Sequence, residues 1–239
     1  MIPVRIKLSN LKLAMCICLG LYSYMVSAQL VEVKDNTIDI AVFNPAYNPE
    51  KYDKAEGSPY SNEAFIPVKL DYLDKTQFVR FNLVDDVIEL KSKSGKNLIV
   101  DLQKDFKIEL LDGSNKFYYT GTFSNEGVKS RSFFELVKET ESFRLFKKER
   151  KKFIEKPKVE AYQDEKYARF IAVNDLYYIS DFKTNSSQIV ALPRKKKKFV
   201  AFFEEKGKLV EKFIKAEKLD IKKQEDLIQI MDFLFTGIK

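Results

Sequence analysis

The sequence contains no histidine and no tryptophan. Histidine is the usual general base near neutral pH and the commonest nitrogen ligand for zinc, copper or iron. Its absence excludes Ser-His-Asp and Cys-His catalysis within this chain. The chemistry that remains is that of carboxylates, lysine or tyrosine, with calcium or magnesium bound through oxygen alone. We therefore expect a protein that is not an enzyme and that holds no cofactor or metal.

Cysteine is scarce as well, because the only two, Cys16 and Cys18, both lie within the first 28 residues. This segment has basic residues before an apolar run of roughly 14 residues, whereas a membrane-spanning helix needs roughly 20. It ends in the small residues Ser27 and Ala28, where a signal peptidase would cut. We expect residues 1–28 to be a signal peptide that is cleaved after Ala28. The mature chain would then have no disulfide and no thiolate metal site.

An exported chain of this kind is expected in the periplasm, at the periphery of the outer membrane, or in the secreted space. No later segment is long and apolar enough to span a membrane, so we expect no transmembrane span in the mature chain. Lipidation at a cysteine and an uncleaved anchor stay open as alternatives. Lipidation is disfavoured because Cys16 follows Met15 inside the apolar run, instead of following a small residue at its end.

Positive charge is unevenly distributed along the chain. Residues 144–218 hold 21 basic and 11 acidic side chains. In an exported protein, a dense basic run points to an envelope protein or an anionic surface as its partner, and not to a specific nucleic acid site. The alternative is that the run is a solvated helix start. The densest run, our candidate contact for a polyanion or partner, is Arg194, Lys195, Lys196, Lys197 and Lys198. A second run, 147–158, is expected to be a solvated strand end.

From Phe65 to Leu192, short segments rich in valine, isoleucine, phenylalanine and tyrosine alternate with turn residues, which is typical of an all-β domain. Glycine after Asp112 tolerates the positive φ that tight hairpin turns require. This many strands predicts an antiparallel meander that closes as a barrel or a sandwich to protect its edges. The expected strands are 66–71, 76–83, 86–91, 97–102, 105–111, 115–123, 131–139, 142–148, 167–172, 175–182 and 187–191.

After Pro193 the apolar spacing changes to that of amphipathic helices. Clusters around Phe199, Phe213 and Met231 each predict one helix, with a break near Gly207. The predicted fold class is α+β, an antiparallel β meander followed by a small C-terminal helical module. The expected divisions are 1–28, a signal peptide; 29–64, an irregular N-terminal leader; 65–192, an antiparallel β domain; and 193–239, the helical module.

Other patterns carry little chemistry. Ser180 and Lys183 match the Ser-x-x-Lys spacing of penicillin-recognising enzymes, but the partner motifs are missing. Adjacent acids such as Asp85 and Asp86 are expected to be solvated turn residues. In each adjacent aromatic pair only one ring can face a shared interior, because successive strand residues point to opposite sides. These pairs are Tyr118-Tyr119, Phe133-Phe134 and Tyr177-Tyr178.

The β pattern is accompanied by Gly57-Ser58-Pro59-Tyr60 with Asn62 and Phe65, by the basic segment KKERKKF at 147–153, and by the ending LVEKFIKAEKLDIKKQEDLIQIMDFL at 209–234. In this layout most of the mature chain resembles a group of exported Bacteroidota-type proteins of unknown function. The resemblance implies a Gram-negative envelope setting. It supplies no activity and no catalytic residue.

Our leading expectation is a non-enzymatic envelope or secreted module that binds a macromolecular partner or helps an envelope assembly. The alternative is a β-barrel carrier or sensor of an apolar or sugar ligand, and an enzyme that uses carboxylates, lysine or tyrosine ranks third. The barrel interior distinguishes the first two, since a deep apolar cavity favours the carrier and a filled interior favours the module. The sequence leaves the oligomeric state undetermined.

Overall fold

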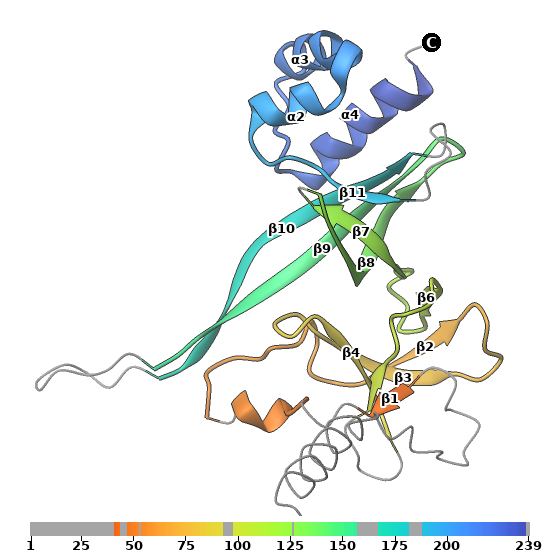
Figure 1. The fold of residues 1–239 in the computed structure, drawn as a ribbon, viewed down its shortest axis with the longest axis vertical. Coiled ribbons are helices and arrows are strands. Elements are labelled where there is room, and N and C mark those ends of the chain that lie inside the picture. Colours follow the sequence, from red (N-terminus) through yellow and green to blue (C-terminus); the bar gives the residue numbers. More distant parts are fainter. Residues whose placement is uncertain are drawn as a thin grey trace, which may run out of the picture. The chain divides into compact units, whose positions relative to one another are not determined.

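The structure is a computed structural model that describes residues 41–43, 47–52, 54–92, 98–125, 127–156, 167–181 and 188–237. It is an α+β fold in which a large sheet is followed by a small helical end, as the sequence predicts (Figure 1). The strands are β1 (Ala41–Phe43), β2 (Ile66–Leu70), β3 (Gln77–Asn82), β4 (Val87–Leu90), β5 (Leu98–Val100), β6 (Lys107–Leu110), β7 (Phe117–Asn125), β8 (Val128–Glu139), β9 (Phe143–Ile154), β10 (Arg169–Asp181) and β11 (Ile189–Ala191). The helices are η2 (Pro49–Tyr52), α2 (Lys196–Phe202), η4 (Glu204–Lys206), α3 (Gly207–Ala216) and α4 (Gln224–Thr236).

The eleven strands of the described residues form one sheet, in the order β1-β5-β4-β3-β2-β6-β7-β11-β10-β9-β8. Because β7 also pairs with β8, the strands β7, β11, β10, β9 and β8 close on themselves, and we call them the ring. The strands β1 to β6 continue from β7 as an antiparallel open sheet (Figure 1). The pairing of β11 with β7 is parallel, which the sequence analysis did not anticipate. The predicted closure of the meander is thus present in the ring, and the rest of the sheet stays open.

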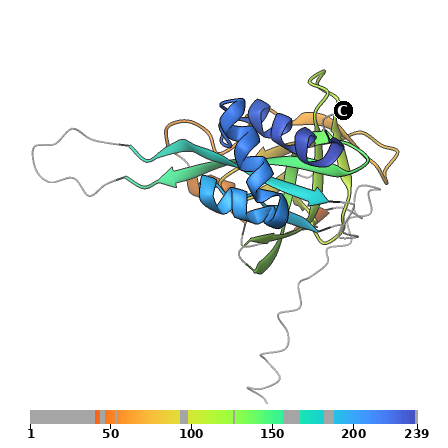
Figure 2. The same ribbon diagram turned by 90° about the horizontal axis from the view of Figure 1, so that it is seen from above.

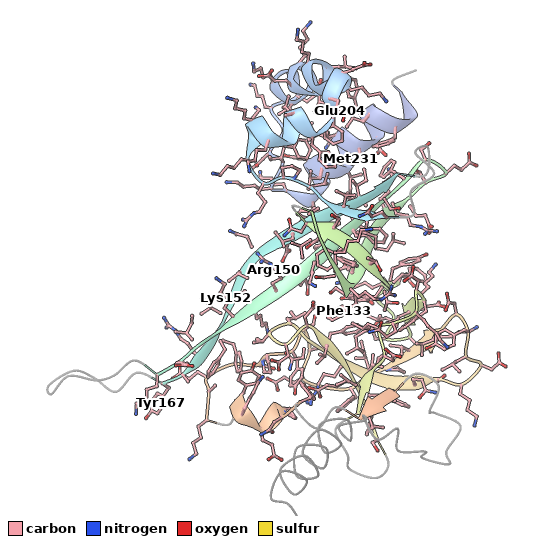
Figure 3. All side chains as sticks on the ribbon, in the orientation of Figure 1. Phe133, Arg150, Lys152, Tyr167, Glu204 and Met231 are labelled. Atoms are coloured by element: carbon pink, nitrogen blue, oxygen red, sulfur yellow. The ribbon has the colours of Figure 1, made fainter. Side chains whose placement is uncertain are left out.

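The hairpin of β7 and β8 separates two hydrophobic cores, one inside the ring and one on the open sheet. In its register Tyr119 lies opposite Phe134, and Thr120 lies opposite Phe133. Tyr119 and Phe134 belong to the core inside the ring, whereas Tyr118 and Phe133 pack with the open sheet. Figure 3 labels Phe133 at this boundary. The predicted division of adjacent aromatic residues between two faces is confirmed here.

Large side chains fill the inside of the ring. Phe134, Phe146, Tyr178 and Ile189 are buried there, and the ring centroids of Phe134 and Tyr178 lie 4.8 Å apart. The absence of a side chain at Gly121 makes room for this packing, since a Cβ atom there would lie 3.1 Å from Cδ1 of Ile189. The interior of the ring around Phe134 and Tyr178 is therefore a packed core, and a pocket of about 200 Å³ lies beside it at Tyr119, Phe146 and Ile189.

The open sheet has its own core because its strands alternate buried and exposed residues. In β2, Val68 and Leu70 are buried while Lys69 between them is exposed. Val68, Phe81 and Ile88 are each at most 1% exposed. Burying a side chain of this size stabilises the fold by about 1.5–3 kcal/mol relative to leaving it in water.

The three α-helices pack on the outer side of the ring (Figures 1 and 2). Phe199 and Met231 from the helices and Leu145 from β9 share one buried cluster, and Figure 3 labels Met231 in it. The predicted break near Gly207 is present, because η4 separates α2 from α3. A Cβ atom at Gly207 would lie 2.6 Å from the backbone oxygen of Val200, so the two helices approach each other at a residue without a side chain.

The hairpin of β9 and β10 continues past the ring as a two-stranded ribbon (Figure 2). The sequence predicted a strand end at 148, but β9 runs on to Ile154 because β10 pairs with it along this length. The predicted strands 167–172 and 175–182 are one strand, β10. A register shift between Val173 and Leu176 interrupts it, which explains why the alternation broke there.

Part of the predicted leader packs on the described end of this ribbon that lies farthest from the ring. Tyr52 packs against Phe153 and Phe170, with ring centroids 5.0 and 5.1 Å apart. Glu56 forms a parallel bridge with Arg169. β1 also lies within the predicted leader and pairs with β5. No helix in the described part of the chain is long and apolar enough to cross a membrane.

Candidate functional site

The basic run that the sequence analysis selected, Arg194 to Lys198, lies at the start of α2. All five of its side chains are exposed. Lys195 is the N-cap residue, it makes no side-chain cap hydrogen bond, and the first turn contains no acidic residue. Exposed cations at this end oppose the helix dipole, at about 0.3–1 kcal/mol each. Helix stability therefore does not explain the run.

Lysines of α3 extend the same basic surface. Lys208, Lys212 and Lys215 are exposed and lie on one side of α3, because residues three and four apart are neighbours on a helix. A hydrogen bond from Lys215, together with the more distant charge of Lys196, holds the pKa of Glu211 below its usual value. Lys196 of α2 is thus close enough to α3 for the two helices to share a surface. We call Arg194–Lys198 together with the three α3 lysines the basic face.

A pocket of about 350 Å³ adjoins the basic face, where β10 meets the start of α2 and the residues around the start of α4. Leu192, Phe199 and Leu227 contribute buried apolar side chains to its lining. Its polar lining consists of Asn174, Asp175, Tyr177, Arg194 and Lys222. We call this the bulge pocket, because Asn174 and Asp175 lie at the register shift of β10. Arg194 belongs to both the pocket and the basic face.

The carboxyl group of Asp175 has an unusual electrostatic environment. Burial raises its pKa, and the nearby carboxylates of Glu149 and Glu135 raise it further. The charges of Lys147 and Arg150 act in the opposite direction but do not cancel the effect. A half-buried carboxyl group with a raised pKa is a candidate for binding a cationic group or for holding a proton.

An ion-pair cluster lies behind the bulge pocket on β8 and β9. The Nζ atom of Lys147 is 2.9 Å from a carboxylate oxygen of Glu135 and 2.9 Å from one of Glu149. Lys116 adds a third contact, 3.2 Å from Glu135. Burial lowers the pKa of Lys147, but the hydrogen bonds and charges of the two carboxylates outweigh burial and raise that pKa above its ordinary value. Lys147 therefore keeps its proton, and its charge acts on Asp175 together with those of Glu149 and Glu135.

A second cluster joins a serine, a lysine and an aspartate, and sequence reasoning missed it. Ser132 donates a hydrogen bond to Asp86 at 2.9 Å, and the ammonium group of Lys148 contacts both residues. Burial lowers the pKa of Lys148, although the charge of Asp86 partly compensates. A lysine that contacts a serine hydroxyl is the arrangement of Ser-Lys acyl transfer. Ser132 has no exposed surface, however, so the cluster as it stands is a structural tie.

The second basic run is used internally, and our expectation of a solvated strand end is wrong for Lys147, Lys148 and Lys151. Lys147 and Lys148 are ion-paired, as described above. Lys151 donates hydrogen bonds to the backbone oxygens of Ser58 at 2.9 Å and Tyr60 at 2.5 Å. Nothing in the spacing of the run shows which of its lysines turn inward, because partners such as Asp86 and Ser58 lie far away in the sequence.

Asp85 and Asp86 were also expected to be solvated. Instead, Asp85 pairs with Lys51 at 2.7 Å and accepts a hydrogen bond from Tyr52 at 2.9 Å. The expectation fails because the turn between β3 and β4 lies against the leader and the ring. Of the Ser-x-x-Lys pair, Ser180 is buried in β10, and Lys183 lies outside the described residues.

Comparison with protein-family models, with curated proteins and with solved structures found no match. Within the described ranges, no three carboxylate or other ligand side chains come together in a way that could hold a metal ion.

Proposed function

We propose that this protein is an exported, non-enzymatic binding module of the cell envelope or the secreted space. Its partner presents clustered negative charge, either on an envelope protein or on an anionic surface. The basic face is the contact, with Arg194, Lys195, Lys196, Lys197 and Lys198 at its centre.

One observation carries the proposal, which is that the two basic runs are used differently. In the run on β9, Lys147, Lys148 and Lys151 make ion pairs or hydrogen bonds within the fold. In the run on α2, none of the residues 194–197 makes an ion pair with any residue that the structure describes, and all are exposed. Exposed cations at 194–197 that have no ion-pair partner among the described residues and oppose the helix dipole are explained by an external anion.

The filled ring also favours a module over a carrier. A carrier would need an enclosed apolar cavity, whereas Phe134, Phe146 and Tyr178 occupy the ring interior. A filled ring supports a protein that binds its partner at the surface, with the ring as the scaffold on which the helices pack.

The binding test compares two matched variants of residues 29–239. The first replaces Lys195, Lys196, Lys197 and Lys198 by glutamine. The control replaces four exposed lysines of the open sheet and the β8 hairpin by glutamine, namely Lys69, Lys75, Lys104 and Lys129. Both variants lose the same net charge, so a difference between them reports position and not total charge.

The probes are dextran sulfate and vesicles of phosphatidylglycerol in phosphatidylcholine, with pure phosphatidylcholine vesicles as blank. We expect the α2 variant to bind both anionic probes at least tenfold more weakly than the unmodified chain, and the control variant to bind within twofold of it. Raising the salt concentration should weaken binding of the unmodified chain, because exposed charges are screened. Equal binding by all three proteins would overturn the proposal.

Export is tested separately by fractionation of a Gram-negative host that expresses the full chain. The expected product is a protein outside the cytoplasm whose intact mass begins at Gln29. Recovery of the uncleaved chain in the cytoplasm would contradict export, and recovery in the membrane with residues 1–28 retained would favour the anchor.

A further inference from the structure

We propose that the bulge pocket binds a small amphipathic zwitterion of the ω-amino carboxylate class, with its cationic group at Asp175 and its anionic group at Arg194 and Lys222. This inference goes beyond the contact of the basic face with a polyanion and does not depend on it.

An irregularity in β10 lies at the pocket. Arg150 pairs with Val173 and Lys148 pairs with Leu176, so one residue of β9, Glu149, stands opposite two residues of β10. These two residues, Asn174 and Asp175, both belong to the pocket lining. β-Bulges of this kind re-aim side chains and are common beside functional sites.

Arg150 holds the bulge in place. Its Nη2 atom donates a hydrogen bond to the backbone oxygen of Asn174 at 2.8 Å. The positive charge of Arg150 also acts on Asp175, but it does not form an ion pair with that carboxylate in the structure. The backbone is thus fixed while the carboxylate itself stays available.

Asp175 has a reason to bind a cation. The structure gives it no hydrogen bond and no ion pair with any described residue, although it is half-buried. Burial disfavours its charge, and the carboxylates of Glu149 and Glu135 repel it, while Lys147 and Arg150 offset these effects only in part. An ammonium or guanidinium group of a ligand would relieve this repulsion and would replace the water that burial removes.

The opposite charge is supplied by a different part of the chain. Arg194 enters the pocket from the connection between β11 and α2, and Lys222 from the connection between α3 and α4. Neither makes an ion pair with a described residue. A carboxylate or phosphate is the group that an arginine and a lysine together recognise.

The pocket lining also has an apolar part. Ala172, Val173, Pro193 and Ile221 line the pocket with apolar groups that are partly or fully exposed, and Phe199 and Leu227 are buried beneath them. The pocket volume of about 350 Å³ falls in the range of small-molecule sites. A ligand in which an aliphatic chain joins an amine to a carboxylate would use the acidic, apolar and basic groups that the lining offers.

The test uses a series of ω-amino carboxylates from 4-aminobutanoate to 8-aminooctanoate, each compared with the alkylamine and the alkanoate of the same chain length. Binding to residues 29–239 is measured by isothermal titration calorimetry and by protein NMR chemical shifts. We expect one member of the series to bind at least tenfold more tightly than both of its one-ended analogues. If no member does so, the proposal is overturned on the unmodified protein alone.

Variants then assign the two ends of the ligand. Asp175→Asn should weaken binding of the best ω-amino carboxylate at least tenfold and leave binding of the alkanoate unchanged. The double variant Arg194→Gln with Lys222→Gln should weaken the alkanoate and leave the alkylamine unchanged. Lys152→Gln, an exposed position on β9 outside the pocket lining, is the matched control, and circular dichroism checks that each variant is folded.

The outcome is separable from that of the proposed function. Asp175→Asn should leave binding to dextran sulfate intact, whereas the glutamine variant of Lys195–Lys198 should leave binding of the ω-amino carboxylate within threefold. An ω-amino carboxylate whose affinity is the same in Asp175→Asn as in the unmodified chain would overturn the proposed pocket.

Discussion

The Nζ atom of Lys148 in β9 lies 2.6 Å from a carboxylate oxygen of Asp86, in the turn that joins β3 to β4. This ion pair ties the open sheet to the ring. The aromatic rings of Phe123 and Phe134 surround the ammonium group, each with its centroid 5.5 Å from Nζ. A lysine placed among aromatic side chains depends strongly on its one carboxylate partner.

Replacing Asp86 by asparagine should therefore destabilise the protein. Asp86 has a φ of 58°, a left-handed conformation that asparagine also tolerates, so the change removes charge without adding backbone strain. We expect the free energy of unfolding to fall by about 1–3 kcal/mol, less than for a fully buried pair because the side chain of Asp86 is 40% exposed. Urea denaturation measures this change.

The controls for this prediction separate charge from shape. The double variant Asp86→Asn with Lys148→Met removes both charges and should recover most of the lost stability. Asp74→Asn changes an exposed acid in another turn and should have no measurable effect. A stability of Asp86→Asn equal to that of the unmodified chain would show that the ion pair is not a tie.

Lys147 gives a sharper test of the cluster behind the bulge pocket. Lys147→Met leaves the carboxylates of Glu135 and Glu149 facing each other without their shared counter-charge. We expect a loss of about 3 kcal/mol in the free energy of unfolding, because breaking a buried ion pair leaves an uncompensated charge. The pKa of Asp175 should rise further, since Lys147 lowers it in the intact protein. Carbon-13 NMR titration of the carboxyl groups measures that shift.

A matched control is available on the surface of α3. The pair of Lys215 with Glu211 is exposed and is formed within one helix, so Lys215→Gln should leave the unfolding transition unchanged. If Lys147→Met and Lys215→Gln had the same effect, the buried cluster would contribute no more than a surface pair.

Local patterns predicted much of the fold. The alternation of apolar residues located ten of the strands, and the apolar spacing after Pro193 located the three α-helices, because both signals depend on neighbours within a few residues. The sequence also indicated that Phe133 and Phe134 would face opposite sides. It did not indicate that β11, which follows β10 in the chain, pairs in parallel with β7. Pairing between distant strands leaves no local signal in the sequence.

The sites show the same limit. The exposed run at Lys195 to Lys198 was found because it is contiguous. The contact of Lys148 with Asp86 was missed because 62 residues separate the two. Asp175 was missed because its importance comes from a bulge, and a bulge is visible only once the register of β9 against β10 is known.

Tyr178 makes the stability of the fold decrease with pH in the alkaline range. Burial raises its pKa to about 12. The charge of Arg150 lowers this pKa slightly, and the charge of Asp86 raises it slightly. Between about pH 10 and pH 12 the unfolded chain has lost the phenolic proton while the folded chain keeps it, so stability falls as the pH rises. Between pH 9 and pH 12, we expect the free energy of unfolding to fall by about 2 kcal/mol less in Tyr178→Phe than in the unmodified chain. Urea denaturation at each pH measures the difference. Tyr167→Phe, at a tyrosine that is 54% exposed, should follow the unmodified chain.

Gly207→Ala sets two effects of opposite sign against each other. Alanine favours a helix over glycine by about 1 kcal/mol, which alone would stabilise the start of α3. The new Cβ atom, however, would lie 2.6 Å from the backbone oxygen of Val200, and backbone cannot rotate away as a flexible side chain can. Overpacking of this kind costs about 1–3 kcal/mol, so we expect a net loss of stability and faster amide exchange in α2. Lys208→Ala, at the next and exposed position, has no such contact and should leave both unchanged. A more stable Gly207→Ala variant would show that α2 and α3 can separate without cost, and the shared basic face would then be a flexible surface.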